Sequence, residues 1–234
     1  MGLYLVNNID MSVRLEPIVA LKNCIVHGFE VLSKVDEVYN VGLVNGFDYE
    51  STFAVLSDDE FLSILIRQFE VIQKWVGQHP EIYSGKVFYF NIRRSLVSDN
   101  DFTSMLIPFC RTYEMSLEFD CSEFNDLCAP LSDAEKKCFE KMQDMGVGIW
   151  IDDYYGRPLV INSNYIEGVK VDRKYFWKVF LMGNYDFLNK DSYISKITKN
   201  IIIEGIETEE QHEFSIKSGS TLGQGYLWKE IIIC

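Results

Sequence analysis

Two adjacent aspartates, Asp152 and Asp153, end an apolar run that begins at Val147. Two neighbouring carboxylates repel each other unless a cation lies between them or water surrounds both. The pair is therefore either a solvated turn or one part of a metal site.

Polar or charged side chains also end six other short apolar runs of the chain: Glu30, Asn91, Glu118, Lys170 with Asp172, Glu204 with Glu207, and Gln224. One acid at the end of a strand is common, because acids often cap the helix that follows. A converging ring of carboxylates would repel itself unless it held cations. Oxygen ligands of this kind select Mg²⁺ or Mn²⁺ over zinc.

Two such ions, roughly 3.5 to 4 Å apart, form the arrangement that clamps a phosphodiester and ionises a water for attack. Asp152 can bridge the ions while Asp153 serves only the second, because the last strand residue and the first loop residue diverge. Lys170 would then orient the water or offset charge on the phosphate.

Each of these residues also has a structural interpretation. Glu30, Glu118 and Glu204 stand in apolar runs, where a buried unpaired carboxylate is costly, so each is expected to be a ligand or an ion-pair partner. Asn91 fits a residue that caps the segment after its strand. Asp172 and Glu207 fit solvated loop acids, and Gln224 fits a turn residue.

Eight apolar, β-branched or aromatic runs predict buried strands at 13–19, 25–32, 87–92, 116–120, 147–152, 167–171, 200–206 and 221–227. Helix-start signals lie between several of them, at Ser57, Ser132 and Thr208, each with Glu or Gln three residues later. Alternating strands and helices indicate parallel strands joined by right-handed crossovers, in an open doubly wound sheet or a closed barrel.

Eight strand candidates in one undivided chain favour a single (β/α)8 TIM-like barrel domain over residues 1–234. Only Ala20 to Cys24 separate the first two runs, which predicts an antiparallel strand near the N-terminus. The chemistry of such a barrel sits at the carboxyl ends of its strands. We therefore expect the polar strand ends to meet in one pocket.

The formal charge of −13, with no dense Lys/Arg run, argues against a nucleic-acid polymer as partner. A small anionic ligand is compatible with this charge if metal ions supply positive charge. The N-terminus lacks a signal-peptide layout and no window reaches membrane-spanning length, so we expect a cytoplasmic protein without a membrane segment. The six scattered cysteines form no zinc or redox motif.

In this order, the polar motifs resemble those of the EAL-domain cyclic-di-GMP phosphodiesterases, a barrel family with one antiparallel strand, and the resemblance runs nearly end to end. The E-A-L motif corresponds to Glu30-Val31-Leu32, N-V-S to Asn91-Ile92-Arg93, E-x-T-E to Glu118-Phe119-Asp120-Cys121, and D-D-F-G to Asp152-Asp153-Tyr154-Tyr155. K-x-D corresponds to Lys170-Val171-Asp172, E-G-V-E-T to residues 204–208, and Q-G-Y to Gln224-Gly225-Tyr226.

The resemblance implies hydrolysis of cyclic di-GMP to linear pGpG with two Mg²⁺ or Mn²⁺ ions. The resemblance implies that one ion is bound by Glu30, Asn91, Glu118 and Asp152. It implies that the second ion is bound by Asp152, Asp153 and Glu204. Lys170 and Glu204 would position and deprotonate the attacking water, with Glu207 and Gln224 in support. Lys34 and Asp172 would contact the substrate.

The chain departs from the family pattern near the expected substrate. Glu16 stands where the family has Gln, and places a carboxylate near an anionic ligand. Lys34 replaces an Arg, which keeps the charge and loses the planar fork that grips phosphate oxygens. Both changes are expected to weaken affinity.

The loop after the paired aspartates departs further. Cys121 replaces a Glu that ties this loop down in the family, and Glu123 is a candidate substitute at a different spacing. Tyr155 replaces a glycine, and because Tyr adopts positive φ only with strain, we expect another loop path that uses Gly156. These changes support an alternative function, a degenerate EAL domain that binds cyclic di-GMP or a protein partner as a regulator without turnover, while the complete set of expected ligands favours the enzyme. A homodimer or a regulatory protein partner is compatible with either function.

Overall fold

The computed structural model describes residues 9–38, 56–124, 130–189 and 192–233, and for residues 9–11, 34–38 and 100 it describes the backbone alone. The strands are β1 (Ile9–Ala20), β2 (Ile25–Val38), β3 (Val87–Asn91), β4 (Glu114–Asp120), β5 (Gly148–Tyr154), β6 (Gly168–Val171), β7 (Asn200–Ile203), β8 (Leu222–Gly223) and β9 (Ile231–Ile233). The α-helices are α2 (Asp58–Gln78), α3 (Pro80–Tyr83), α4 (Asn100–Cys110), α5 (Asp133–Asp144), α6 (Arg173–Leu181), α7 (Tyr193–Ile197) and α8 (Glu209–Lys217). Short 3₁₀ turns are η2 (Arg94–Leu96), η3 (Cys121–Phe124), η4 (Ser163–Tyr165) and η5 (Tyr185–Leu188).

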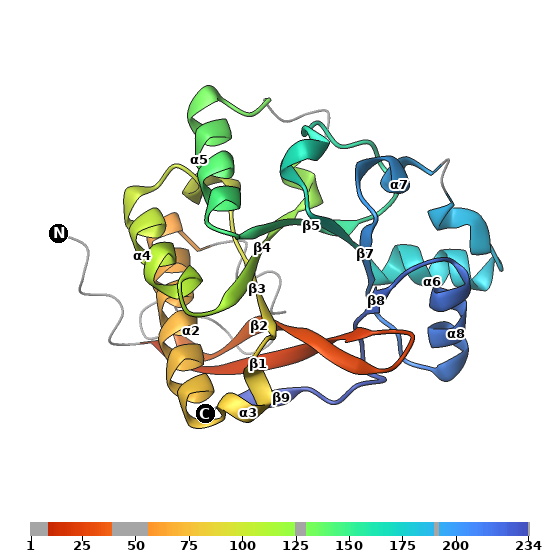
Figure 1. Ribbon diagram of the computed structural model, residues 1–234, viewed down its shortest axis with the longest axis horizontal. Coiled ribbons are helices and arrows are strands. Elements are labelled where there is room, and N and C mark those ends of the chain that lie inside the picture. The colour runs from red at the N-terminus through yellow and green to blue at the C-terminus, as the bar shows by residue number, and fades with distance from the viewer. Residues whose placement is uncertain (1–8, 39–55, 125–129, 190–191, 234) are drawn as a thin grey trace.

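Eight strands close into a barrel. Strands β2 to β8 pair in parallel in chain order, and β1 lies antiparallel between β8 and β2 and closes the ring. Strand β9 pairs with β1 at Val13–Leu15. The predicted (β/α)8 barrel with an antiparallel strand near the N-terminus is confirmed, and Figure 1 shows the longer helices outside the strands.

Several strand limits differ from the sequence prediction, among them those of β2, β5 and β8. Strand β2 continues to Val38, beyond the predicted end at 32, because it pairs with the N-terminal half of β1 after β3 has separated from it at Val31. Glu30 therefore lies inside a strand, although it still lies where β2 leaves the parallel sheet. Strand β5 runs past Asp153 to Tyr154, and β8 is much shorter than the predicted run 221–227.

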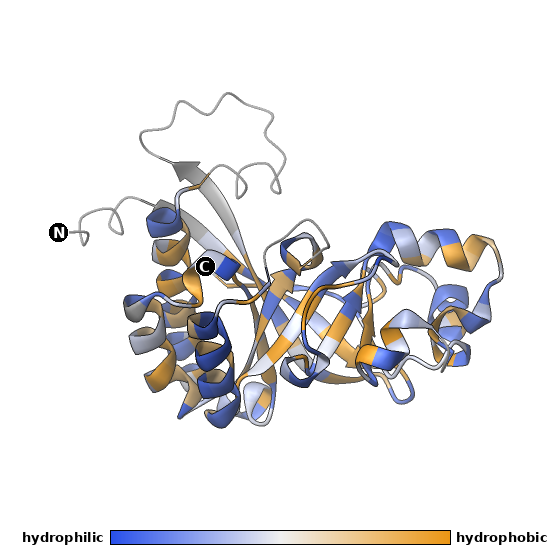
Figure 2. Cartoon of the chain, turned by 90° about the horizontal axis from the view of Figure 1, so that it is seen from above, coloured by the Kyte–Doolittle hydropathy of each residue, from blue (hydrophilic) through white to orange (hydrophobic). Residues whose placement is uncertain are grey.

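The three predicted helix starts are confirmed as capping boxes. The side chains of Ser57, Ser132 and Thr208 accept hydrogen bonds from the backbone N–H three residues on, and the Glu or Gln at that position bonds back. The helices that follow cover the barrel, and the strands carry many hydrophobic residues (Figure 2). No helix within the described part of the chain combines the length and apolarity needed to cross a bilayer.

An apolar layer fills the barrel interior below the predicted site. It consists of Ile18, Tyr89, Trp150 and Ile202, and the rings of Tyr89 and Trp150 meet edge to face with centroids 5.4 Å apart. Side chains two apart on a strand share a face, so each of these residues shares its face with a polar residue next along the strand. Tyr89 precedes Asn91, Trp150 precedes Asp152 and Ile202 precedes Glu204 in this way. The apolar layer thus supports a polar layer at the mouth.

Gly168 provides a test of this packing, because a Cβ at this position would come within 2.3 Å of the Trp150 ring. We expect Gly168→Ala to lower the free energy of unfolding by about 1–3 kcal/mol, the usual cost of overfilling a close-packed core. Urea denaturation followed by circular dichroism measures the change.

Gly77→Ala is the matched control. Gly77 lies near the end of α2, and a Cβ there would meet nothing within 4 Å. Removal of a helix glycine should raise the free energy of unfolding by roughly 0.5–1 kcal/mol. Equal stabilities of the two variants would contradict the packing around Trp150.

Candidate active site

The polar ends of the strands gather at one end of the barrel, in the floor and walls of a cavity of about 1010 Å³. The predicted residues that line it are Glu30, Asn91, Asp152, Asp153, Asp172, Glu204, Glu207 and Gln224. Glu118 and Lys170 lie below this surface and are almost fully buried. The structure thus brings together residues that are separated by almost two hundred positions in the sequence.

Lys170 is the centre of the cluster. Its ammonium Nζ lies 3.0 Å from Glu30 Oε2, 3.2 Å from Glu118 Oε1, 3.1 Å from Asp152 Oδ1 and 2.9 Å from Glu204 Oε1. The Lys170 side chain is 0% exposed. A fully buried ammonium is costly unless it is paired, and here β2, β4, β5 and the residue directly after β7 each supply a carboxylate to it.

Gln224 resolves a like-charge contact between two neighbouring strands. Glu16 and Glu30 lie directly opposite each other in the β1–β2 hairpin, an arrangement that destabilises a sheet when both are charged. The amide Nε2 of Gln224 donates to both, at 2.9 Å to Glu16 Oε2 and 2.5 Å to Glu30 Oε2. Asn91 Nδ2 donates to the other Glu30 oxygen at 3.0 Å. Glu30 is therefore held on both oxygens.

The cluster holds more negative than positive charge. Burial acts to lower the pKa of Lys170, but the four carboxylates outweigh burial and hold its pKa well above the usual value. Burial raises the pKa of Glu118 and Glu204 well above their usual range, and also raises that of Asp152, although Lys170 opposes these shifts. For Glu30, Lys170 and the bonds from Gln224 and Asn91 outweigh burial, so its pKa is lowered.

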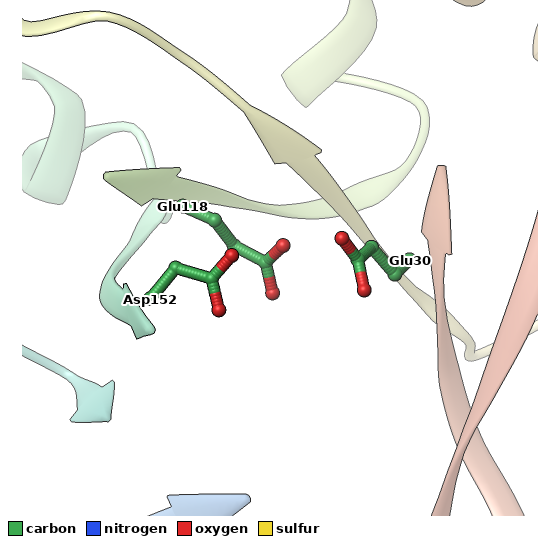
Figure 3. Close-up of side chains that lie close together, drawn as sticks. All are labelled: Glu30, Glu118 and Asp152. Atoms are coloured by element: carbon green, nitrogen blue, oxygen red, sulfur yellow. The ribbon is translucent and has the colours of Figure 1, made fainter. Parts of the chain in front are cut away.

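Two groups of three carboxylates are close enough to share an ion. Glu30, Glu118 and Asp152 bring one oxygen each within 4.8 Å of one another, and Asp152, Asp153 and Glu204 form a second group within the same limit. Asp152 belongs to both. Figure 3 shows the carboxylates of the first group turned toward a common space.

The cluster fits a hard divalent cation. Glu118 Oε1 and Asp152 Oδ1 are buried and accept no well-aligned hydrogen bond from the described residues, although each lies near the Lys170 ammonium. Buried oxygens without such bonds, in a group that one ammonium cannot neutralise, are suited to coordinate a cation. An all-oxygen donor set of this kind suits Mg²⁺ or Mn²⁺.

Asp153 takes a backbone conformation that departs from that of a regular strand. Its φ is 53°, in the left-handed region that non-glycine residues seldom adopt. The pairing of β5 with β6 is irregular between Ile151 and Tyr154, which is typical of a bulge. The thiol of Cys121 donates to the backbone carbonyl of Asp153 at 3.1 Å. Cys121 therefore contacts the backbone turn on which the second group depends.

The expected loop path is found, but not the expected anchor. Gly156 has φ 89°, and its neighbour Tyr155 is not among the positive-φ residues, so the turn uses Gly156 as predicted. The Glu123 carboxylate instead accepts the backbone N–H of Arg94 at 3.1 and 3.3 Å, which ties η3 to η2. Glu123 as the substitute loop anchor was wrong, because η3 turns its side chain toward the end of β3.

Asp172 and Glu207 are not among the carboxylates that pair with Lys170. Asp172 caps α6 by accepting the Tyr175 N–H at 2.8 Å while it lines the cavity wall. Glu207 is half-buried on the same wall, at the start of the α8 capping box. The side chain of Lys34 falls outside the described residues. The roles of these three residues stay predictions.

Sequence reasoning missed several residues of the cavity. Asp120 follows Glu118 by two positions and so shares its face, a spacing that could have identified it. Glu16 was expected to disfavour an anionic ligand, but its bonds to Gln224 and Arg14 hold part of its charge within the protein. Arg173 and Lys174 also line the cavity, directly after Asp172. No sequence spacing predicts the contact between Cys121 and Asp153.

Comparison with known families agrees with this geometry. The family model for the EAL domain matches residues 4–230. The chain belongs to the EAL domain family. The acid cluster lies within the matched residues.

Relatives and neighbours of this EAL domain are distant in sequence. It is 23% identical over 242 residues to the probable cyclic di-GMP phosphodiesterase PdeB of Escherichia coli strain K12, with 97% of this chain covered; the chain spans 44% of that relative's length. The PaMucR phosphodiesterase in complex with c-di-GMP is similar in fold at a TM-score of 0.71, with 20% identity, over 94% of this chain and 92% of that one. The EAL-like domain protein YdiV is similar at a TM-score of 0.67, with 15% identity, over 99% and 96%. The last two comparisons concern the fold alone.

The contact from Cys121 to Asp153 predicts unequal metal sites. We expect Cys121→Ala to weaken Mn²⁺ binding at the Asp152, Asp153 and Glu204 group by about 10- to 100-fold, the usual effect of losing a group that orients a ligand. Binding at the Glu30, Glu118 and Asp152 group should not change. Calorimetric titration with Mn²⁺ resolves the two.

Cys138→Ala is the control, since Cys138 is a half-buried thiol on α5 outside the cavity lining. It should bind Mn²⁺ like the unmodified protein. A Cys121→Ala variant with two unchanged affinities would show that the thiol does not support Asp153.

The raised pKa values predict that the metal-free protein is less stable at neutral than at mildly acidic pH. Burial raises the pKa of Glu123 and Asp153 to about 7, from ordinary values of 4.5 and 3.8. Between these values the folded state binds more protons than the unfolded state, so the free energy of unfolding falls as pH rises from about 5 to about 7. The Asp153 side chain is exposed at the mouth, and solvent therefore reduces its contribution to the pH dependence of stability. Thermal unfolding in a chelator at about pH 5.5 and pH 7.5 measures the trend.

Saturating Mn²⁺ should stabilise the protein more at the higher pH, because at the lower pH the ions must displace protons from Asp153 and the other carboxylates of the two groups. The paired substitutions Glu123→Gln and Asp153→Asn should flatten the metal-free trend. Higher metal-free stability at neutral pH would contradict the raised pKa values.

Proposed function

We propose that this EAL domain is a phosphodiesterase that hydrolyses cyclic di-GMP to linear pGpG with two divalent cations, Mg²⁺ or Mn²⁺. The observation that carries the proposal is the pair of carboxylate groups that share Asp152 in the floor of the cavity. A cavity of about 1010 Å³ is at the upper end of the range of small-ligand sites, which suits a dinucleotide. The family match and the PdeB relative support the choice of ligand.

Each residue has a role in this proposal. Bound divalent cations would activate water and offset phosphate charge. Their proposed ligands are Glu30, Asn91, Glu118 and Asp152 on one side, and Asp152, Asp153 and Glu204 on the other. Lys170 orients the attacking water, and Glu204 accepts its proton. Gln224 fixes Glu30, Glu207 supports the wall, and Lys34 and Asp172 contact the nucleotide.

A second function has specific support, namely binding of cyclic di-GMP or a protein partner as a regulator without turnover. Cys121 contacts Asp153 through a weak thiol donor where the family has a carboxylate. The Lys170 ammonium lies within 3.3 Å of four carboxylates that the ions would need. We also propose a location in the cytoplasm, and a homodimer or a regulatory protein partner is compatible with either function.

Incubation of purified protein with cyclic di-GMP and Mn²⁺ tests the proposal. We expect linear pGpG from the unmodified protein, and a loss of at least about 100-fold in kcat for Glu30→Gln, because this substitution removes a charged ligand that also pairs with Lys170. Chromatography of the nucleotides measures both. Chelation of the metal should abolish turnover.

Glu70→Gln is the matched control, since Glu70 pairs with Arg67 on the exposed side of α2. It should retain full activity. Binding of cyclic di-GMP without product in the presence of Mn²⁺ would favour the regulator, and neither binding nor product would contradict both functions.

A further inference from the structure

The cavity is strongly acidic for a site that is proposed to take a doubly anionic ligand. Its lining includes acids beyond the two metal groups, namely Glu16, Asp120, Glu123, Asp172 and Glu207. Metal ions would offset the negative charge of the phosphate that is cut. The second phosphate of a cyclic dinucleotide therefore needs positive charge from the protein elsewhere in the cavity.

Among the side chains that the structure describes, four cationic ones line the cavity, and two of them are already paired. Arg14 binds Glu16 at 2.9 Å and Glu230 at 3.3 Å. Arg93 binds Asp58 at 3.1 Å and the Leu56 carbonyl at 2.7 Å. These two arginines hold the wall together and have less charge to offer a ligand.

The other two cationic side chains are those of Arg173 and Lys174, and they are not paired with acids of the described residues. Within the described part of the chain, neither forms an ion pair or a side-chain hydrogen bond. Both are exposed at the mouth, directly after the Asp172 cap. Their charges therefore face solvent and the cavity.

The stem of Arg173 is nevertheless held in place. Its guanidinium Cζ lies 5.4 Å from the centre of the Trp177 ring, and a Cβ at Gly205 would come 2.1 Å from Arg173 Cγ. The Trp177 indole donates to the Gly205 carbonyl at 2.8 Å. Arg173 is thus packed against the residue that follows Glu204, beside the second metal group.

Helix stability does not explain these two cations. Arg173 and Lys174 occupy the first turn of α6, where the helix dipole disfavours positive charge, and this turn contains no acid. Lys178, in the last turn of the same helix, has the favoured position. A pair of cations placed against the dipole, beside an acidic cavity, is accounted for by an anionic ligand.

We propose that Arg173 and Lys174 bind the phosphate that is not cut, and so select cyclic dinucleotides over ligands with one phosphodiester. This inference rests on the proposed function and names two residues that it leaves without a role. The guanidinium fork can bind two phosphate oxygens, and the ammonium adds a point charge. Cleavage of the other phosphodiester does not require them.

The double variant Arg173→Gln/Lys174→Gln tests the proposal, with Lys178→Gln as the control on the same helix. We expect the KM for cyclic di-GMP to rise about 10- to 100-fold with kcat within about twofold, because charged hydrogen bonds to phosphate are lost while the metal groups stay intact. Hydrolysis of bis(p-nitrophenyl) phosphate, which has a single phosphodiester, should be unchanged. Calorimetric binding of cyclic di-GMP without divalent cations should weaken to a similar extent and lose much of its salt dependence.

The outcomes separate this proposal from the proposed function. If the unmodified protein binds or cuts cyclic di-GMP and the double variant matches it, the role of Arg173 and Lys174 is overturned and the phosphodiesterase proposal stands. If the unmodified protein neither binds nor cuts it, both are overturned. Thermal unfolding should be unchanged or shifted upward in the double variant. If that variant does not fold, Lys174→Gln alone decides, with an expected rise in KM of about 3- to 10-fold.

Discussion

The structure depends on a single buried ammonium at the centre of a closed barrel. Lys170 is paired with carboxylates from β2, β4, β5 and the end of β7. Without this lysine the acids would repel one another in a medium that screens charge poorly, and without the acids the lysine would lose its charge or leave the interior. These four strand ends are therefore held in place by electrostatic pairing as well as by backbone bonds. The apolar layer of Ile18, Tyr89, Trp150 and Ile202 fills the barrel interior below the cluster.

The negative charge of the same cluster is only partly neutralised by Lys170, and the remaining carboxylates can therefore bind cations. One ammonium satisfies the charge of Glu30, while burial raises the pKa of Glu118, Asp152 and Glu204. A site that retains protons in the absence of metal can exchange them for divalent cations. The shared position of Asp152 couples the two candidate ion sites. A regular strand would direct the adjacent side chains of Asp152 and Asp153 to opposite faces, and the left-handed backbone at Asp153 accompanies the arrangement in which both belong to the second group.

The cationic side chains of the cavity above the cluster differ in whether they are paired with acids. Arg14 and Arg93 neutralise acids of the wall, whereas Arg173 and Lys174 are placed at the mouth against the preference of their own helix. The Gln224 amide keeps the facing acids Glu16 and Glu30 compatible.

The sequence by itself determined the barrel, the antiparallel first hairpin, three capped helices and the identity of the polar strand ends. These follow from local patterns, since strand periodicity, hairpin spacing and capping boxes act over a few residues. The tertiary structure alone decided that Lys170 lies among four carboxylates, that Gln224 bridges Glu16 and Glu30, and that Cys121 contacts the Asp153 backbone while Glu123 turns to Arg94. These contacts join residues from strands far apart in the chain, and their geometry depends on how barrel closure and a bulge in β5 orient each side chain. No local pattern contains that information, because the spacing along the chain does not record the register between strands.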